Sequence, residues 1–121
     1  MTFYNQKIKE LTNSLYPRED LTKRIIGAKQ FIDSHYAKNL DLDTICKEAC
    51  ISKYHFIRLF KRYYGCTPHQ YLTEVRVKKA KKLILNGVTV RGACFSVGYN
   101  SVTSFSTLFK KINGTAPSRI E

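Results

Sequence analysis

The chain has 121 residues, 43% of them hydrophobic and 12% aromatic, which is enough for a buried core and excludes a disordered chain. The net charge is +12, with +3 from residues 1–60 (ten basic against seven acidic) and +9 from residues 61–121 (eleven against two), so a polyanion such as nucleic acid is the expected partner. No apolar run approaches the ~20 residues that span a bilayer, and the N-terminus lacks the apolar segment of a signal peptide, so we expect neither a membrane span nor secretion.

Residues 1–17 are predicted to be an N-terminal extension or linker. Their apolar residues have helical spacing up to Pro17, namely Tyr4, Ile8, Leu11 and Leu15. The segment fits an extra helix or the end of a linker that follows a sensor domain. Whether Met1 is a native start stays open, and the abrupt end of the chain favours a domain cut from a longer protein.

Residues 18–66 are predicted to form a first unit of three helices. The first helix ends near Asn39, Asp41 caps the second, and Ser52 begins the third, which stops at Gly65. The inward positions are expected to be Leu21, Ile25, Ala28, Ile32 and Tyr36 in the first helix, Leu42, Ile45, Cys46 and Ala49 in the second, and Phe56, Leu59, Phe60 and Tyr63 in the third.

Residues 67–87 are predicted to be a long linker helix. Thr67, Pro68 and Gln70 have the spacing of a capping box with proline in the first helical position. Gly87 stops the helix after about Asn86, so its length is about 19 residues or roughly 28 Å.

Residues 88–121 are predicted to form a second unit, which repeats the first. A short helix is followed by a turn, "GYNS", and by a longer helix that Gly114 and Pro117 terminate. The inward positions are expected to be Val90, Ala93, Cys94 and Val97, then Phe105, Leu108, Phe109 and Ile112. No segment has the period of two that a strand requires, so the predicted fold is all-α with about seven helices.

The repeat is visible in the letters themselves. Residues 104–117, "SFSTLFKKINGTAP", match residues 55–68, "HFIRLFKRYYGCTP", at an offset of 49, whereas Cys46 matches Cys94 and Cys50 matches Gly98 at an offset of 48. The second copy therefore has one extra residue in or just after its turn. Two helices joined by about three residues form a helix-turn-helix, whose second helix enters the DNA major groove. A plain helical bundle would need the same core residues, but it would not need the basic surface.

These segments also carry a family resemblance. "LDTICKEACISKYHFIRLFKRYYGCTPHQYLTEVRVKKAKKLI" and "VGYNSVTSFSTLFKKINGTAPSR" closely resemble the DNA-binding domain of AraC/XylS-type bacterial transcription regulators, over about residues 20–120. The resemblance implies seven helices in two homeodomain-like helix-turn-helix subdomains bridged by a long helix. It also implies sequence-specific binding to double-stranded promoter DNA and activation through RNA polymerase, in the bacterial cytoplasm at the nucleoid. A stand-alone chain would bind as a monomer, and a missing effector domain could make it a dimer.

The third helix of the first unit presents the candidate base-reading residues Lys53, Tyr54, Ile57 and Arg58. Arg58 is the strongest candidate, because a guanidinium pairs with guanine O6 and N7 and such a contact discriminates by about 1–3 kcal/mol. The family uses the positions of Tyr54, Ile57 and Arg58 in this way. His55 is expected to pack or to contact phosphate.

The matching helix of the second unit offers only short side chains for base readout, namely Val102, Thr103 and Thr107. Well-studied relatives often carry Gln or Arg in place of Val102 and Thr107. We therefore expect the first unit to read the bases of its half-site stringently and the second unit to bind its half-site mainly through phosphate contacts. Phosphate contacts are predicted for Ser52, Lys61, Arg62, Ser101, Ser106, Lys110 and Lys111. The basic residues of the linker helix could face DNA or solvent: Arg76, Lys78, Lys79, Lys81 and Lys82.

The four cysteines leave a second class of function open. Cys46, Cys50, Cys66 and Cys94 have no C-x-x-C spacing, and we expect them to be small buried residues in a reducing compartment. We therefore predict no enzyme activity, cofactor or metal. The alternatives are a thiol-based redox sensor, an alkyl-accepting DNA repair protein, and a nonspecific basic module for membrane surfaces or proteins.

Overall fold

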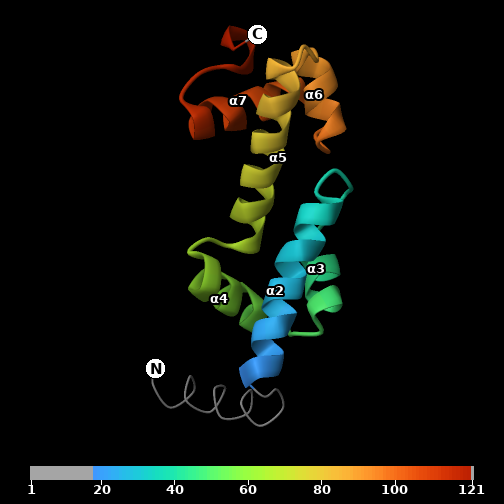
Figure 1. The fold of residues 1–121 in the computed structure, drawn as a ribbon, viewed down its shortest axis with the longest axis vertical. Coiled ribbons are helices and arrows are strands. Elements are labelled where there is room, and N and C mark those ends of the chain that lie inside the picture. Colours follow the sequence, from blue (N-terminus) through green and yellow to red (C-terminus); the bar gives the residue numbers. More distant parts are fainter. Residues whose placement is uncertain (1–17, 121) are drawn as a thin grey trace.

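The computed structural model describes residues 18–120, which form six α-helices, one short 3-10 helix and no strand (Figure 1). In chain order these are α2 (Arg18–His35), α3 (Leu42–Ala49), α4 (Lys53–Tyr64), α5 (Pro68–Leu85), α6 (Val90–Ser96), α7 (Val102–Asn113) and η1 (Pro117–Arg119). The all-α prediction is confirmed, and the extension or linker predicted for residues 1–17 lies outside the described residues. None of the described helices is long and apolar enough to cross a membrane.

The buried side chains form two separate clusters, one at each end of the elongated molecule (Figure 1). The first lies among α2, α3 and α4, and the second among α6, α7 and the C-terminal part of α5. The long helix α5 contributes to both, because Leu72 belongs to the first cluster, whereas Val77, Ala80 and Ile84 belong to the second. The chain thus contains two helix-turn-helix units, and α5 is part of both cores as well as their connection.

Local capping signals explain most helix boundaries. The carboxylate of Asp41 accepts hydrogen bonds from the backbone N and the Oγ1 of Thr44, both at 2.8 Å. Thr67 and Gln70 form the predicted reciprocal capping box, with bonds of 2.9 and 3.1 Å. Gly65 and Gly114 end α4 and α7 at φ values of 76° and 82°, which a residue without Cβ adopts at no steric cost.

Three expectations about helix ends and inward-facing helix positions are wrong. The first helix ends at His35 and not near Asn39, because the chain leaves the helix there and the backbone N of Lys38 closes a turn onto the carbonyl of His35 at 3.0 Å. Tyr63 and Ile112 were expected to point inward, but each is 43% exposed. Both lie in the last turn of their helix, beyond most of the core. In α4 the next residue, Tyr64, packs there instead, with its ring 4.8 Å from that of Phe60.

Candidate nucleic-acid interface

The turn of the first helix-turn-helix depends on Cys50, which has left-handed backbone angles, φ 54° and ψ 41°. Its N–H donates to carbonyls of the last turn of α3, and the N–H of Ile51 donates to Cys46 O at 3.3 Å. The buried side chain of Ile51 then anchors the turn in the first core. This conformation turns the chain sharply so that α4 starts at Lys53. The repeat, in which Cys50 matches Gly98, is the sequence signal that could have indicated it.

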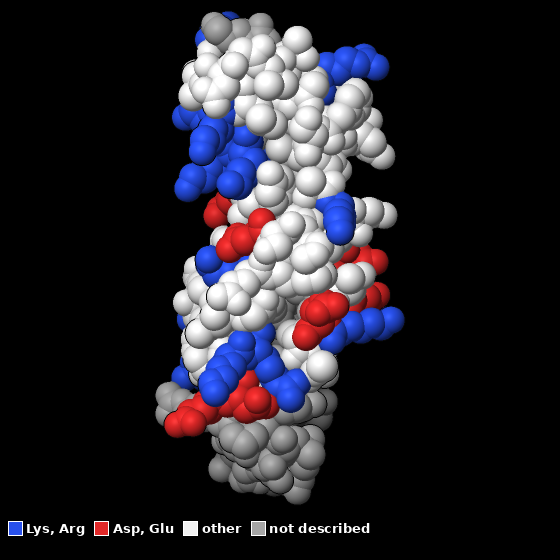
Figure 2. Space-filling model, turned by 45° about the vertical axis from the view of Figure 1, so that its right-hand side comes forward, with Lys and Arg blue, Asp and Glu red and all other residues white. Residues whose placement is uncertain are grey.

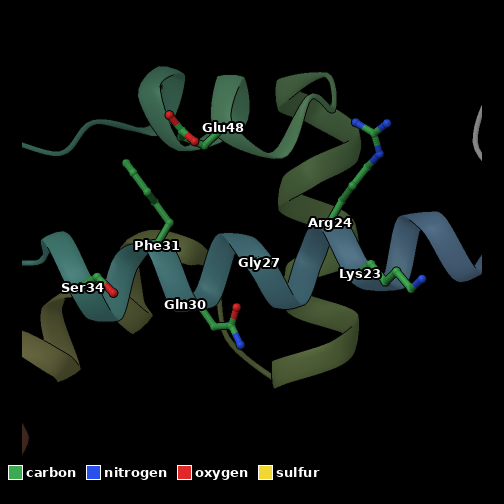
Figure 3. A pocket seen from close by; sticks show the side chains of 7 residues that line it. All are labelled: Lys23, Arg24, Gly27, Gln30, Phe31, Ser34 and Glu48. Carbon is green, nitrogen blue, oxygen red and sulfur yellow. The ribbon is translucent and has the colours of Figure 1, made fainter.

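Arg24 holds this turn in place from α2, a role that sequence reasoning missed. Its Nη1 donates to the carbonyl oxygens of Ala49 and Cys50 at 3.2 and 3.3 Å, and its Nε pairs with Asp20 at 2.7 Å. The hydrogen bond with Asp20 also raises the pKa of Arg24. Figure 3 shows Arg24 extending from α2 toward the segment between α3 and α4. The residues joined are about 25 positions apart, so no local pattern indicates the contact.

The second turn uses a glycine where the first uses a cysteine. Gly98 has φ 103°, and the N–H of the next residue, Tyr99, donates to Cys94 O at 3.1 Å. The positive-φ residues are 48 positions apart, whereas α4 and α7 begin 49 positions apart, at Lys53 and Val102. The predicted extra residue is therefore confirmed, and it lies between Gly98 and the start of α7.

The outer face of α4 presents the predicted readout residues in two different ways. Tyr54 is 59% exposed, and the Arg58 guanidinium carbon lies 5.7 Å from the centroid of its ring. This stacking restricts the Arg58 side chain on the exposed face. Lys53 lies 3.4 Å from Asp43 in an exposed pair, which holds it weakly. Ile57 is half-buried, so only part of its side chain can contact a ligand.

The outer face of α7 is shorter and more polar. Thr103 and Thr107 are exposed, and Thr107 Oγ1 donates to the carbonyl of Thr103 at 3.1 Å. Val102 is half-buried and packs against the second core. Because the Thr107 hydroxyl proton is already used within the helix, this side chain has only an acceptor to offer a base edge. Weaker hydrogen-bonded readout by α7 than by α4 stays a prediction.

The predicted phosphate-contacting residues flank these two faces. Lys61, Arg62, Lys110 and Lys111 are exposed in the last turns of α4 and α7. Ser52 precedes α4 and makes no side-chain capping bond, whereas the hydroxyl of Ser101, which precedes α7, accepts from Ser104 N at 3.3 Å. Ser106 is half-buried. The two basic pairs occupy equivalent places in the two units.

The charge distribution distinguishes the two ends of the molecule. Residues 75–120 contain nine Lys or Arg and no Asp or Glu. On the face in Figure 2, basic and acidic groups alternate over the lower part, whereas the upper part, over the second unit, shows only basic groups among neutral ones. The second unit therefore offers a surface without repulsive charge toward a polyanion.

His55 adds no positive charge to α4 near neutral pH. Its side chain is half-buried, and its buried Nε2 has no hydrogen-bond partner in the described part of the chain. Burial, and then the nearby charge of Arg58, lower the pKa of His55 below its ordinary value of 6.5. The imidazole thus packs, uncharged, in the first turn of α4.

The cysteines do not form a reactive cluster. All four are free thiols; Cys46 and Cys94 are buried and Cys66 is half-buried, but Cys50 is exposed, contrary to expectation, because it occupies the turn. Burial raises the pKa of the thiols of Cys46, Cys66 and Cys94, which disfavours the thiolate that alkyl transfer requires.

The grooves on the surface do not resemble sites for small molecules. The one in Figure 3 lies on α2 beside α3, with Phe31 pointing toward α3 and Gln30 pointing away from it. Its lining side chains carry both signs of charge and do not converge on one point. Within residues 18–120 no group of three or more His, Cys, Asp or Glu residues could hold a metal ion.

Comparison with known proteins places these features in a family. The model of the helix-turn-helix domain family matches residues 45–121. The lactose operon transcription activator of Staphylococcus xylosus is 33% identical over 85 residues, which cover 69% of this chain and 30% of that protein. The chain spans between 26% and 43% of the length of three such curated relatives.

Two solved structures have the same fold. The C-terminal domain of AraT, a response regulator from Geobacillus stearothermophilus, has a TM-score of 0.77 at 28% identity, with 80% of this chain and 82% of that one covered. The DNA-binding domain of AdpA, a global transcriptional factor crystallised with a target DNA, has a TM-score of 0.75 at 23% identity, with coverage of 78% and 86%.

Proposed function

Because this chain belongs to the AraC/XylS family of helix-turn-helix transcription regulators, we propose that α4 and α7 are its two recognition helices and enter adjacent major grooves of one DNA duplex. The chain is a DNA-binding domain, and double-stranded DNA is its partner. The recognition surface consists of the outer faces of α4 and α7 together with the basic pairs at their C-terminal ends.

The observation that carries the proposal is the repeated geometry of the two units. Each recognition helix follows a tight turn with a positive-φ residue, buries a Phe pair, and ends in two exposed basic residues and a left-handed glycine. A bundle without a ligand would need the Phe pairs but not the two basic pairs. The absence of acidic residues from 75 to 120 supports the same interpretation.

The length of α5 supports binding in successive grooves on one side of the duplex. Its 18 residues span about 27 Å, somewhat less than the ~34 Å between equivalent points of the major groove. If the separation of α4 and α7 also falls short of one turn, binding both grooves would bend the DNA at a cost of a few kcal/mol. A monomer bound in this way reads an asymmetric site of about 20 base pairs, without the two-fold symmetry that a dimer imposes.

The two half-sites would be read unequally. Arg58 can form a bidentate pair with guanine, whereas α7 offers threonines and a half-buried valine. We also infer that the whole protein activates transcription, as the name of the lactose operon relative suggests. Contact with RNA polymerase, which the family resemblance implies, is the proposed route.

The test is selection of bound duplexes from a random library of about 25 base pairs at about 50 and 200 mM salt. We expect an enriched asymmetric motif with one sharply specified half and, about one helical turn away, one less specified half. Binding without enrichment that disappears at the higher salt would overturn the proposal and leave a nonspecific basic module. Stronger binding to anionic vesicles than to duplex would point to a membrane surface.

A pair of charge variants makes the selection sharper. Lys110→Gln removes a predicted phosphate contact, whereas Lys23→Gln removes an equally exposed charge from α2, outside the recognition surface. Lys110→Gln should lower affinity for all duplexes and reduce the slope of log K against log salt by about 1, while Lys23→Gln should leave both unchanged. Equal effects of the two variants would contradict the assignment of the surface.

A further inference from the structure

The two units meet at a junction formed around Arg76 of α5. Figure 1 shows the loop after α2 lying next to the C-terminal end of α6, with α5 beside both. The Nε of Arg76 donates to Tyr36 O at 2.7 Å, and its Nη2 donates to Lys38 O at 2.8 Å. One side chain thereby closes the loop after α2 onto the linker helix, across about 40 positions of sequence.

The other side of the same guanidinium contacts the turn of the second helix-turn-helix. Its central carbon lies 5.3 Å from the centroid of the Tyr99 ring, which in turn lies 5.6 Å from that of Phe105 in α7. A Cβ on Gly98 would lie 3.0 Å from Ala37 O and 3.2 Å from Arg76 Cζ, so the absence of a side chain at Gly98 permits this approach. Arg76 therefore lies between the α2 loop and the turn that orients α7.

The junction matters because little else joins the two units. Within residues 18–120 the main helix packing runs from each unit to α5, and no extensive packing joins α2, α3 or α4 to α6 or α7. Tyr36 is an exception, since its half-buried ring packs against both cores. A single helix can bend or twist along its length, and a small rotation there would displace α7 relative to α4.

We propose that Arg76 is a positioning residue that sets the spacing and rotation between α4 and α7, and so determines which separation of two DNA half-sites the protein accepts. The inference rests on the proposed two-groove binding. An arginine suits this place because its planar fork reaches two carbonyls while its cationic carbon lies over a ring. A lysine ammonium is a compact charge without that fork. The basic residues of the linker helix, which sequence reasoning treated as one group, thus have different tasks.

The experiment measures affinity for duplexes in which the two selected half-sites are separated by spacers that differ by single base pairs. Each added pair changes the separation by about 3.4 Å and the rotation by roughly 35°. The wild type should prefer one spacing by about tenfold over its neighbours, since a displaced half-site loses its base contacts. Arg76→Lys should reduce that preference to about threefold or less and leave affinity for a single half-site unchanged. Tyr99→Leu should act in the same direction, because it removes the ring under the guanidinium.

Lys81→Gln is the matched control, because Lys81 is an exposed charge on the same helix outside the junction. It should keep the wild-type spacing preference, with any change in affinity equal at every spacing. If Arg76→Lys keeps the sharp preference, or loses affinity for a single half-site to the same degree as for the pair, the proposal is overturned.

A second readout needs no DNA and separates this proposal from the proposed function. NMR relaxation of α4 and α7 amides should report one common rigid-body tumbling in the wild type and added motion of the two units relative to each other in Arg76→Lys. If the wild type selects no two-part motif, the proposed function fails, and the tumbling alone then decides whether Arg76 positions the units. Common tumbling in the variant would refute that role as well.

Discussion

Replacing Gly98 by alanine should destabilise the protein more than replacing Gly65, although both glycines have positive φ. At Gly65, φ is 76° and a new Cβ would meet nothing within 4 Å. Only backbone strain then opposes the substitution, at about 1–2 kcal/mol. At Gly98, φ is 103°, and the Cβ would press on a backbone carbonyl at 3.0 Å and on the Arg76 guanidinium at 3.2 Å.

The additional loss of stability in Gly98→Ala arises because the new Cβ must displace neighbouring atoms. Neither the Ala37 carbonyl nor the guanidinium is the free end of a flexible chain, because Arg76 is held by hydrogen bonds of 2.7 and 2.8 Å. Loosening these partly exposed bonds costs about 1 kcal/mol each. We therefore expect Gly98→Ala to lower the free energy of unfolding by about 3–4 kcal/mol and Gly65→Ala by about 1–2 kcal/mol.

Urea unfolding, followed by far-ultraviolet circular dichroism and tyrosine fluorescence, measures the difference. With an m value of about 2 kcal/mol/M, the two midpoints should differ by about 1 M. Cys50→Gly is the control at the equivalent turn, where relief of strain at φ 54° and the greater freedom of glycine in the unfolded chain should cancel to within about 1 kcal/mol. Equal midpoints for Gly98→Ala and Gly65→Ala would refute the close packing of the junction.

Three further outcomes test other parts of the structure. Arg58→Ala should lose about 1–3 kcal/mol of discrimination between bases at one base pair of the selected site. Thr107→Ala should leave the selected motif nearly unchanged. The reverse result in the duplex selection would contradict unequal readout of the two half-sites. The free energy of unfolding should fall as pH drops below 6.5 toward the lowered pKa of His55, because the unfolded chain protonates this histidine more readily than the folded protein does. In urea titrations, His55→Gln should lose less unfolding free energy between pH 7 and pH 5 than the wild type. Thr67→Ala should cost about 1 kcal/mol in the same assay at pH 7, since it removes half of a capping box, and an unchanged midpoint would show that packing alone holds the start of α5.

Helical period alone locates much of the candidate site. The Phe pairs of α4 and α7 imply outward faces on the opposite sides of these helices, so exposed positions such as Arg58 and Thr107 follow from the spacing of the apolar residues. The edges of each face are less predictable. Ile57 and Val102 were expected to point outward and are half-buried, because the burial of such flanking positions depends on how closely the neighbouring helix packs.

The two turns differ in how far their conformation could be predicted. Glycine at position 98 indicated a turn directly. Cysteine has no preference for positive φ, so at Cys50 the conformation was indicated through its match with Gly98 in the repeat and not by the residue type. The conformation at Cys50 is imposed by the capping carbonyls of α3 and by Arg24, which reaches the turn from another helix. The exposure of its thiol follows from that position.

The helices, most of their caps, the repeat and the basic character of the second half could be predicted from the sequence, because periodicity and capping depend on residues within about four positions of each other. Which basic side chains stabilise the fold could not be predicted, because it depends on how the helices pack. Arg24 and Arg76 look like any other basic residue along the chain, yet each donates to carbonyl oxygens 25 to 40 positions away. Such contacts exist only once the helices have packed, and they orient the two turns that position α4 and α7.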